Sequence, residues 1–153
     1  MTAEIVTNKG TMNLDLYEKE TPGTVANFVK LAKSGFYDGL KWHRMIPGFM
    51  IQGGCPNTRE GATGMPGTGG PGYSIPCEVS APNQKHDEGV IAMAHRGRNT
   101  GGSQFYICFS RNQTQHLDGH HTCFGKIQDE NSLNVLRSLQ QNDSIEKVTI
   151  LES

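Results

Sequence analysis

The sequence has 153 residues, of which 35% are hydrophobic and 19% are charged, a composition typical of one globular domain, 1–153, with a substantial core. Its 14 basic and 15 acidic side chains give a formal net charge of −1, which excludes the broad basic surface of nucleic-acid-binding proteins. No long apolar run indicates a membrane span, and the first residues show no secretory signal pattern. We therefore expect a cytoplasmic protein with neither nucleic-acid nor membrane partners.

The first two predicted elements are a β-hairpin and a helix. Residues 4–17 contain two short runs joined by a Gly-containing turn, and the second run alternates apolar with polar residues, as a half-buried strand does. Apolar residues then recur at helical spacing between Thr21 and Gly35. Thr21 suits the N-cap of this helix, Pro22 its first turn, and Gly35 its end.

The rest of the chain predicts short strands and a second helix. The helix is expected over 129–141, where leucines follow two acidic residues at the start. The predicted strands are 40–46, 49–54, 75–79, 89–94, 103–109, 122–127 and 144–151. With the two strands of the hairpin there are nine short candidates, close to the number that closes a small barrel. This tally favours a mainly β fold, a closed eight-stranded antiparallel β-barrel whose open mouths are capped by two α-helices.

Residues 53–72 are rich in glycine and proline and predict a long, structured loop. Its segment GTGGPG, at 67–72, lacks the lysine and the hydroxyl residue of a phosphate-binding loop and precedes a predicted strand. It therefore indicates a loop that turns repeatedly close to another surface, and not a nucleotide site. Ser103 lacks the sequence pattern of a nucleophile elbow, so hydrolase chemistry is not indicated either.

Three histidines lie close together in HLDGHH, at 116–121, but their spacing is not that of a helical zinc motif, and the Asp-Gly pair predicts a turn. We expect loop or pocket histidines here, with no metal and no cofactor. The cysteines form no CxxC pair and are expected to be reduced thiols in or near the core. They are Cys55, Cys77, Cys108 and Cys123.

The segment WHRMIPGFMIQGG, at 42–54, places one arginine, Arg44, among large apolar residues. Because a guanidinium stays charged at any pH that proteins meet, burying it unpaired would be costly. Arg44 therefore either points to solvent from an alternating strand or lines a pocket that needs a fixed positive charge. The residue alone leaves both alternatives open, and the solvated one is the more common.

This segment resembles a motif of the cyclophilins, the peptidyl-prolyl cis–trans isomerases. Three further motifs, in the family's order, extend the resemblance over nearly the whole chain: GTGG at 67–70, AMAHRGRNTGGSQFYI at 92–107 and HLDGHHTCFGKI at 116–127. The resemblance implies an eight-stranded barrel with two helices, in agreement with the tally of strands. It also implies a monomeric enzyme that needs no cofactor and acts on X–Pro bonds in peptides and in unfolded or loop segments of proteins.

Carried over residue by residue, the resemblance implies that Arg44 is the catalytic residue. Gln52 and Gln104 would orient it and hold the substrate, and the glycines at 67–70 would border a second, shallower pocket. The pocket for the proline ring would consist of Phe49, Met50, Tyr106 and Leu117, with His121 at its edge. The backbone that pairs with the residue before proline would be that of Ala94, His95 and Arg96.

The chain departs from the familiar members at three of these places. His116, also expected to bind substrate, stands where they carry a tryptophan associated with cyclosporin binding, so the resemblance does not establish cyclosporin as a ligand. Tyr106 replaces a phenylalanine and adds a hydroxyl that needs a partner. Arg96 adds charge, from which we expect a preference for acidic residues beside the proline. These changes leave one alternative open, a non-catalytic module that binds proline peptides in a larger assembly.

Overall fold

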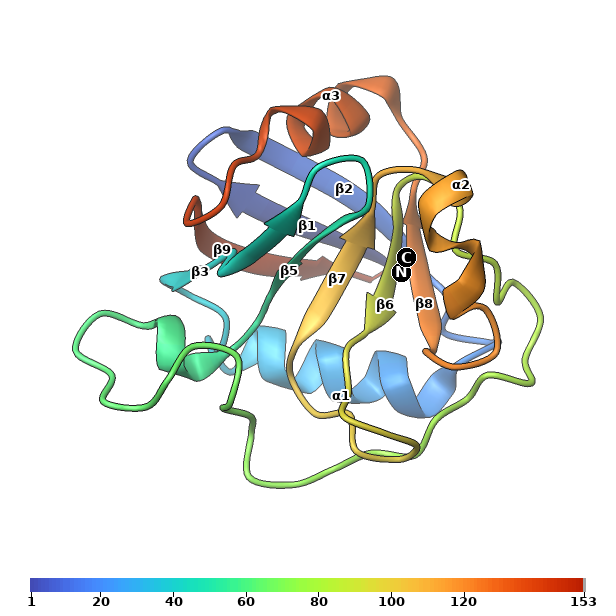
Figure 1. The fold of residues 1–153 in the computed structure, drawn as a ribbon, viewed down its shortest axis with the longest axis horizontal. Coiled ribbons are helices and arrows are strands. Elements are labelled where there is room, and N and C mark those ends of the chain that lie inside the picture. The colour runs from blue at the N-terminus through green and yellow to red at the C-terminus, as the bar shows by residue number, and fades with distance from the viewer. Residues whose placement is uncertain (153) are drawn as a thin grey trace.

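The computed structural model describes residues 1–152, which form one curled antiparallel sheet with helices at its ends (Figure 1). The strands are β1 (Thr2–Thr7), β2 (Gly10–Leu16), β3 (Leu40–Lys41), β4 (Arg44–Ile46), β5 (Met50–Gly53), β6 (Val90–Met93), β7 (Phe105–Cys108), β8 (Cys123–Ile127) and β9 (Ser144–Leu151). Their order across the sheet is β3-β9-β1-β2-β8-β6-β7-β5-β4. The fold is therefore mainly β, as predicted, and the predicted hairpin is present as β1 and β2.

The prediction of a closed eight-stranded barrel was wrong, because the sheet has nine strands and is an open half-barrel. Its edge strands β3 and β4 follow one another in the chain, but within residues 1–152 no ladder joins them. Trp42, which lies between them, instead pairs its backbone with Asn142 (2.7 Å) and Asp143 (2.9 Å), just before β9. The expected strand at 40–46 is therefore split in two: β3 pairs with β9 at one edge of the sheet, and β4 pairs with β5 at the other.

Alternation along the central strands places side chains on two faces of the sheet. In β7, Phe105 and Ile107 are fully buried in the main core, which also contains Trp42 and Phe28. Tyr106 points to the opposite face, where a smaller buried cluster lies. That cluster consists of Met50, Val90, Ala92, Tyr106, Cys108 and Cys123. This second face can carry a site without opening the main core.

The helix α1 (Pro22–Lys33) lies across one end of the half-barrel (Figure 1). Thr21 is its N-cap by position, as predicted, but the Thr21 hydroxyl donates to the Tyr17 carbonyl and makes no capping bond. The free amides of the first turn donate instead to the carboxylate of Glu78, from Gly23 at 3.3 Å and Thr24 at 2.6 Å. A carboxylate suits this position because a helix N-terminus carries partial positive charge.

The helix α3 (Glu130–Ser138) lies across the opposite end, and the short α2 (Arg111–Thr114) follows β7 (Figure 1). Asp129 caps α3 by accepting the backbone N–H of Ser132 at 2.9 Å. The helix α2 was not predicted, because four residues are too few to show helical periodicity. It continues into a 3-10 turn, η2 (Gln115–Leu117), which carries the HLDGHH segment past β8.

The predicted strand at 75–79 is absent from the described residues apart from a single bridge between Ile75 and Gly101. Pro76 explains its failure, since proline cannot donate to a ladder. The loop at 53–72 includes a 3-10 turn, η1 (Pro56–Thr58), and is otherwise irregular, as expected. The four cysteines are free, and all but Cys77 are buried. None of the helices in residues 1–152 has the length and apolar character needed to cross a membrane.

Candidate active site

A row of directly opposed residues crosses four strands on the second face of the sheet. Arg44 in β4 lies opposite Gln52 in β5. Gln52 lies opposite Tyr106 in β7, which in turn lies opposite Ala92 in β6. Because opposed residues in antiparallel strands have neighbouring Cβ atoms, this register gathers an arginine, an amide and a phenol from three separate segments.

A groove of about 590 Å³ lies over this row. Its walls come from β4, β5 and β7, from the loop that follows β6, from the glycine-rich loop and from the turn after η2. The lining residues are Arg44, Phe49, Met50, Gln52, Gly67, Thr68, Gly69, Gly70, Pro71, Tyr73, Ala94, His95, Arg96, Thr100, Gly102, Ser103, Gln104, Tyr106, Leu117 and His121. An apolar floor bounded by a few polar groups is the usual form of a ligand site.

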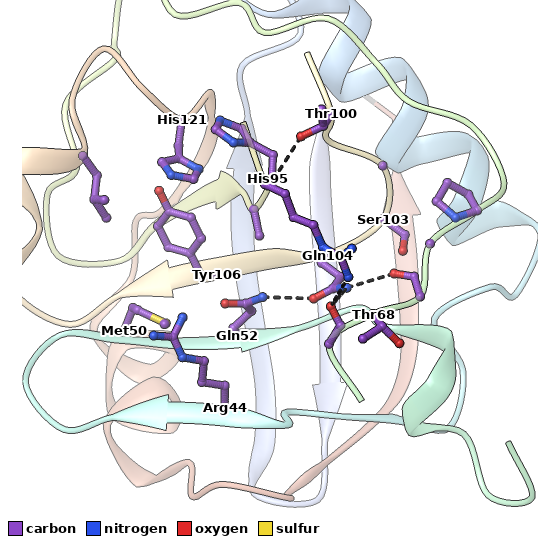
Figure 2. Close-up of a pocket in the computed structure, with 18 of the residues that line it drawn as sticks. Arg44, Met50, Gln52, Thr68, His95, Thr100, Ser103, Gln104, Tyr106 and His121 are labelled. Carbon is purple, nitrogen blue, oxygen red and sulfur yellow. Dashed lines mark hydrogen bonds between the residues drawn. The ribbon is translucent and has the colours of Figure 1, made fainter. Parts of the chain in front are cut away.

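Hydrogen bonds across the groove hold the glycine-rich loop against the sheet (Figure 2). The Gln52 side-chain amide donates to the Gln104 side-chain carbonyl at 3.0 Å. The Gln104 amide then donates to the carbonyls of Gly67 (3.0 Å) and Gly69 (2.9 Å). From behind, the Cys55 thiol accepts the N–H groups of the same two glycines, at 3.2 and 3.3 Å. Both glycine peptides are thus held from two sides.

The guanidinium of Arg44 is exposed and forms no ion pair with any carboxylate in residues 1–152. Figure 2 shows the side chain rising from β4 toward Met50 and Gln52, beside the floor that Tyr106 forms. Gln52 and Gln104 bond to each other and not to Arg44. The Arg44 donors are therefore available to a molecule bound in the groove.

A buried chain of hydrogen bonds supports the floor of the groove. The Tyr106 hydroxyl lies 2.7 Å from Nε2 of His86, a fully buried side chain, and His86 Nδ1 lies 2.8 Å from the Asp118 carboxylate. Burial alone would raise the pKa of Asp118, but hydrogen bonds from Arg111 and His86 lower that pKa to about 2. Since the ionised carboxylate can only accept, His86 donates through Nδ1, and Nε2 accepts the Tyr106 proton. Burial also lowers the pKa of His86, so the imidazole is neutral.

Two stacked imidazoles form the rim next to Tyr106. The rings of His95 and His121 lie parallel, with centroids 4.0 Å apart. His95 Nε2 lies 2.6 Å from the His120 carbonyl, and its Nδ1 accepts the Gly97 N–H at 3.1 Å. His121 Nδ1 lies 2.9 Å from the Met93 carbonyl and so carries the proton. Each ring is held by the backbone, and the Nε2 lone pair of His121 has no partner among the described residues.

Comparison with known proteins identifies the family of this chain. The family model described as cyclophilin type peptidyl-prolyl cis-trans isomerase/CLD matches residues 2–152. A peptidyl-prolyl cis-trans isomerase of Synechococcus elongatus is 53% identical over 97% of this chain and 95% of its own. Peptidyl-prolyl cis-trans isomerase B of Bacillus subtilis is 45% identical over 91% of this chain and 90% of its own. The chain belongs to the cyclophilin family. Its activity is peptidyl-prolyl cis–trans isomerisation.

A solved structure supports the same conclusion about the fold. A cyclophilin type isomerase of Cryptosporidium parvum, crystallised in the presence of the dipeptide Ala-Pro, matches with a TM-score of 0.85 at 30% identity. The match covers 100% of both chains. The open half-barrel is therefore a cyclophilin fold.

The groove of this cyclophilin brings together nearly all the residues predicted from the sequence. Besides Arg44, those that line it are Phe49, Met50, Gln52, Ala94, His95, Arg96, Gln104, Tyr106, Leu117 and His121. His116 is the exception, because it is exposed and lies outside the lining. Its ring stacks on that of Phe49, a lining residue, with centroids 5.7 Å apart.

Several residues of the groove were missed by sequence reasoning. Thr68, Pro71, Tyr73 and Thr100 come from irregular loops, whose placement no periodicity predicts. His86 was also missed, although the Tyr106 hydroxyl gave a signal by requiring a partner. The HLDGHH segment contributes a groove wall, and the described residues contain no group of three or more His, Cys, Asp or Glu placed to bind a metal ion.

We expect His121 to stay neutral well below the pH at which a free histidine gains its proton. Burial lowers the pKa of His121 to about 4, although its bond to the Met93 carbonyl opposes the shift. The unfolded chain therefore binds this proton more readily than the folded one, and the resulting stability is full above about pH 6.5 and is lost as the pH falls toward 4. Titration of the ring nitrogen shifts by NMR checks this. A midpoint at pH 6 or above would contradict the prediction. In urea unfolding, the wild-type protein should lose more stability between pH 7 and pH 5 than the His121→Gln variant, which lacks the titrating ring.

Proposed function

We propose that this cyclophilin, acting as a single isomerase domain, lays a proline-containing peptide along the groove and uses Arg44 as the catalytic donor. The proline ring would occupy the apolar floor formed by Phe49, Met50, Tyr106 and Leu117. The Cryptosporidium parvum relative was crystallised in the presence of Ala-Pro, which supports an X–Pro dipeptide unit as the core of the ligand. The residue before proline would pair with the backbone at 94–96.

The chemistry explains why an arginine is suited to this task. Resonance locks the X–Pro amide behind a barrier of roughly 18–20 kcal/mol. At the twisted transition state the proline nitrogen regains its lone pair and can accept a hydrogen bond, which a planar amide nitrogen cannot do. A fixed cationic donor aimed at that atom stabilises the transition state more than either ground state, which is the requirement for catalysis. Arg44 supplies such a donor without any change in its own protonation.

The observation that carries the proposal is the unpaired Arg44 guanidinium beside a preformed apolar floor. A structural arginine would be paired, and the register places Arg44 on the same face of the sheet as Gln52 and Tyr106, which line the groove. The floor is preformed because the buried bond from Tyr106 to His86 fixes the ring in place. A binding module would need the floor but not the free charge, and is therefore not favoured.

Peptide titration combined with exchange measurements tests the proposed site. We expect an Ala-Ala-Pro-Phe peptide to shift the backbone amide signals of Gln52, Gln104 and Tyr106, and substoichiometric protein to speed cis–trans exchange above the spontaneous rate. Shifts gathered instead around Tyr17, Gln84 and Lys126, which line a separate polar hollow, would contradict the assignment of the site. Tight binding in the groove with exchange at the spontaneous rate would favour the binding module.

A further inference from the structure

The groove carries positive charge and lacks compensating carboxylates. Its lining includes Arg44 and Arg96, and none of the described lining residues is Asp or Glu. Arg98 follows on the loop that supplies Arg96, outside the lining. This local excess contrasts with the whole chain, whose formal net charge is −1.

None of these three arginines is neutralised by the protein. Among residues 1–152, no carboxylate lies within 4.0 Å of the guanidinium of Arg44, Arg96 or Arg98. Arg111 and Arg137, which lie elsewhere on the surface, each pair with two carboxylates. Arg59, also outside the groove, has no carboxylate partner but donates to the backbone carbonyls of Phe36 and Asp38. Arg44 and Arg96 therefore bring positive charge into the groove that no carboxylate of the described residues neutralises.

Arg96 lies at the side of the groove that the glycine-rich loop forms. Its Nη2 lies 3.5 Å from the Gly67 carbonyl, the same oxygen that accepts the Gln104 amide at 3.0 Å. The guanidinium thus spans from the loop after β6 to the glycine-rich loop. The Arg96 backbone N–H donates to the Thr100 hydroxyl at 3.0 Å, which fixes the base of the side chain. A contact of 3.5 Å to a neutral carbonyl is weak, so a carboxylate can take its place.

We propose that Arg96 makes this groove select peptides that carry an acidic side chain two positions before the proline. The inference rests on the proposed function, in which the residue before proline lies against the backbone at 94–96. The next residue toward the peptide N-terminus then lies beside the Arg96 guanidinium and the peptides of Gly67 and Gly69. A carboxylate there meets a planar donor that can bind both of its oxygens.

The expected preference for an acidic side chain is small, because the ion pair with Arg96 is exposed to water. An exposed ion pair changes an equilibrium by roughly two- to fivefold, and salt screens it. A selectivity of this order biases the choice among client sites but excludes none of them. We expect the effect in kcat/KM, since the contact forms on binding and persists in the transition state.

A peptide series tests the proposal on the full chain. The probes are acetylated and amidated Ala-Xaa-Ala-Pro-Phe peptides with Glu, Gln or Lys at Xaa, and kcat/KM is measured by NMR exchange. Wild-type protein should prefer Glu over Lys by roughly two- to fivefold at low salt, and 0.5 M NaCl should reduce that ratio. Arg96→Ala should bring the ratio close to one, and Arg96→Glu should reverse it. A role for Arg96 in folding alone would not reverse a ratio measured within one variant.

Arg98→Ala is the matched control, because it removes the same charge from the same loop outside the lining. It should preserve the Glu/Lys ratio. Equal rates for the Glu and Lys peptides with wild-type protein would overturn the proposal, as would an equal loss of preference in Arg96→Ala and Arg98→Ala. Acceleration of the neutral Gln peptide separates the two levels of inference. If that peptide is accelerated without any charge preference, only the role of Arg96 fails, whereas no acceleration of any peptide contradicts the proposed function itself.

Discussion

Replacing Arg44 with alanine is expected to lower kcat for X–Pro exchange by roughly ten- to a hundredfold, the size of a charge-assisted hydrogen bond of about 1.5–3 kcal/mol. KM should change much less, because the proline nitrogen accepts this bond only in the twisted transition state. The fold should be unaffected, since Arg44 is exposed and forms no ion pair with a carboxylate in the described residues. The measurement is NMR exchange spectroscopy on Ala-Ala-Pro-Phe, together with thermal unfolding of each variant.

Arg44→Lys is the informative companion variant. Lysine keeps the charge but presents a compact ammonium in place of a planar fork, so we expect activity between those of alanine and arginine. If lysine restores the full rate, charge alone is sufficient and the directed hydrogen bond is not needed. An Arg44→Ala protein that exchanges the peptide as fast as wild type would remove Arg44 from the chemistry. Any acceleration that survives in a folded Arg44→Ala protein measures what the apolar, preorganised floor contributes by itself.

The regular elements of this fold were largely predictable because their signals are local. Alternation in residues 4–17 and helical spacing after Thr21 each report a face that packs on a core, and both elements are present. Closure of the barrel was not predictable in this way. It depends on how the segment 40–46 divides, with β3 pairing with β9 and the backbone of Trp42 bonding to the turn at Asn142, some hundred residues away, and no local pattern carries that information.

The site was predictable in its residues but not in its geometry. The pattern around Arg44 left two alternatives open, a solvated strand residue, which is the more common, and a pocket residue. The resemblance favoured the pocket. What places Arg44 beside Tyr106 is the pairing of β4 with β5 and of β5 with β7, which is a property of the folded sheet. Similarly, the requirement of the Tyr106 hydroxyl for a partner could be stated from the sequence. Its partner His86 could not be named, because it lies on a loop with no periodic signal.

The second large effect is expected at this buried pair. His86→Leu removes, from a fully buried position, the acceptor of the Tyr106 hydroxyl and one donor to Asp118. It should destabilise the protein by on the order of 2–4 kcal/mol. Tyr106→Phe leaves the His86 Nε2 lone pair unpaired and should cost about 1–3 kcal/mol. Urea unfolding of both variants measures these costs.

The double variant His86→Leu/Tyr106→Phe decides whether the pair acts as a unit. It replaces both partners with apolar groups, so its loss of stability should fall short of the sum of the single losses by at least about 1 kcal/mol. Strictly additive losses would show that the 2.7 Å contact between Tyr106 and His86 contributes nothing specific. Activity should be lower in His86→Leu than in the double variant. In His86→Leu the Tyr106 hydroxyl has lost its acceptor and the ring would shift out of its place in the floor of the groove, whereas phenylalanine needs no partner there. A double variant that regains stability but not kcat/KM would mean that the hydroxyl acts on the substrate as well as on His86.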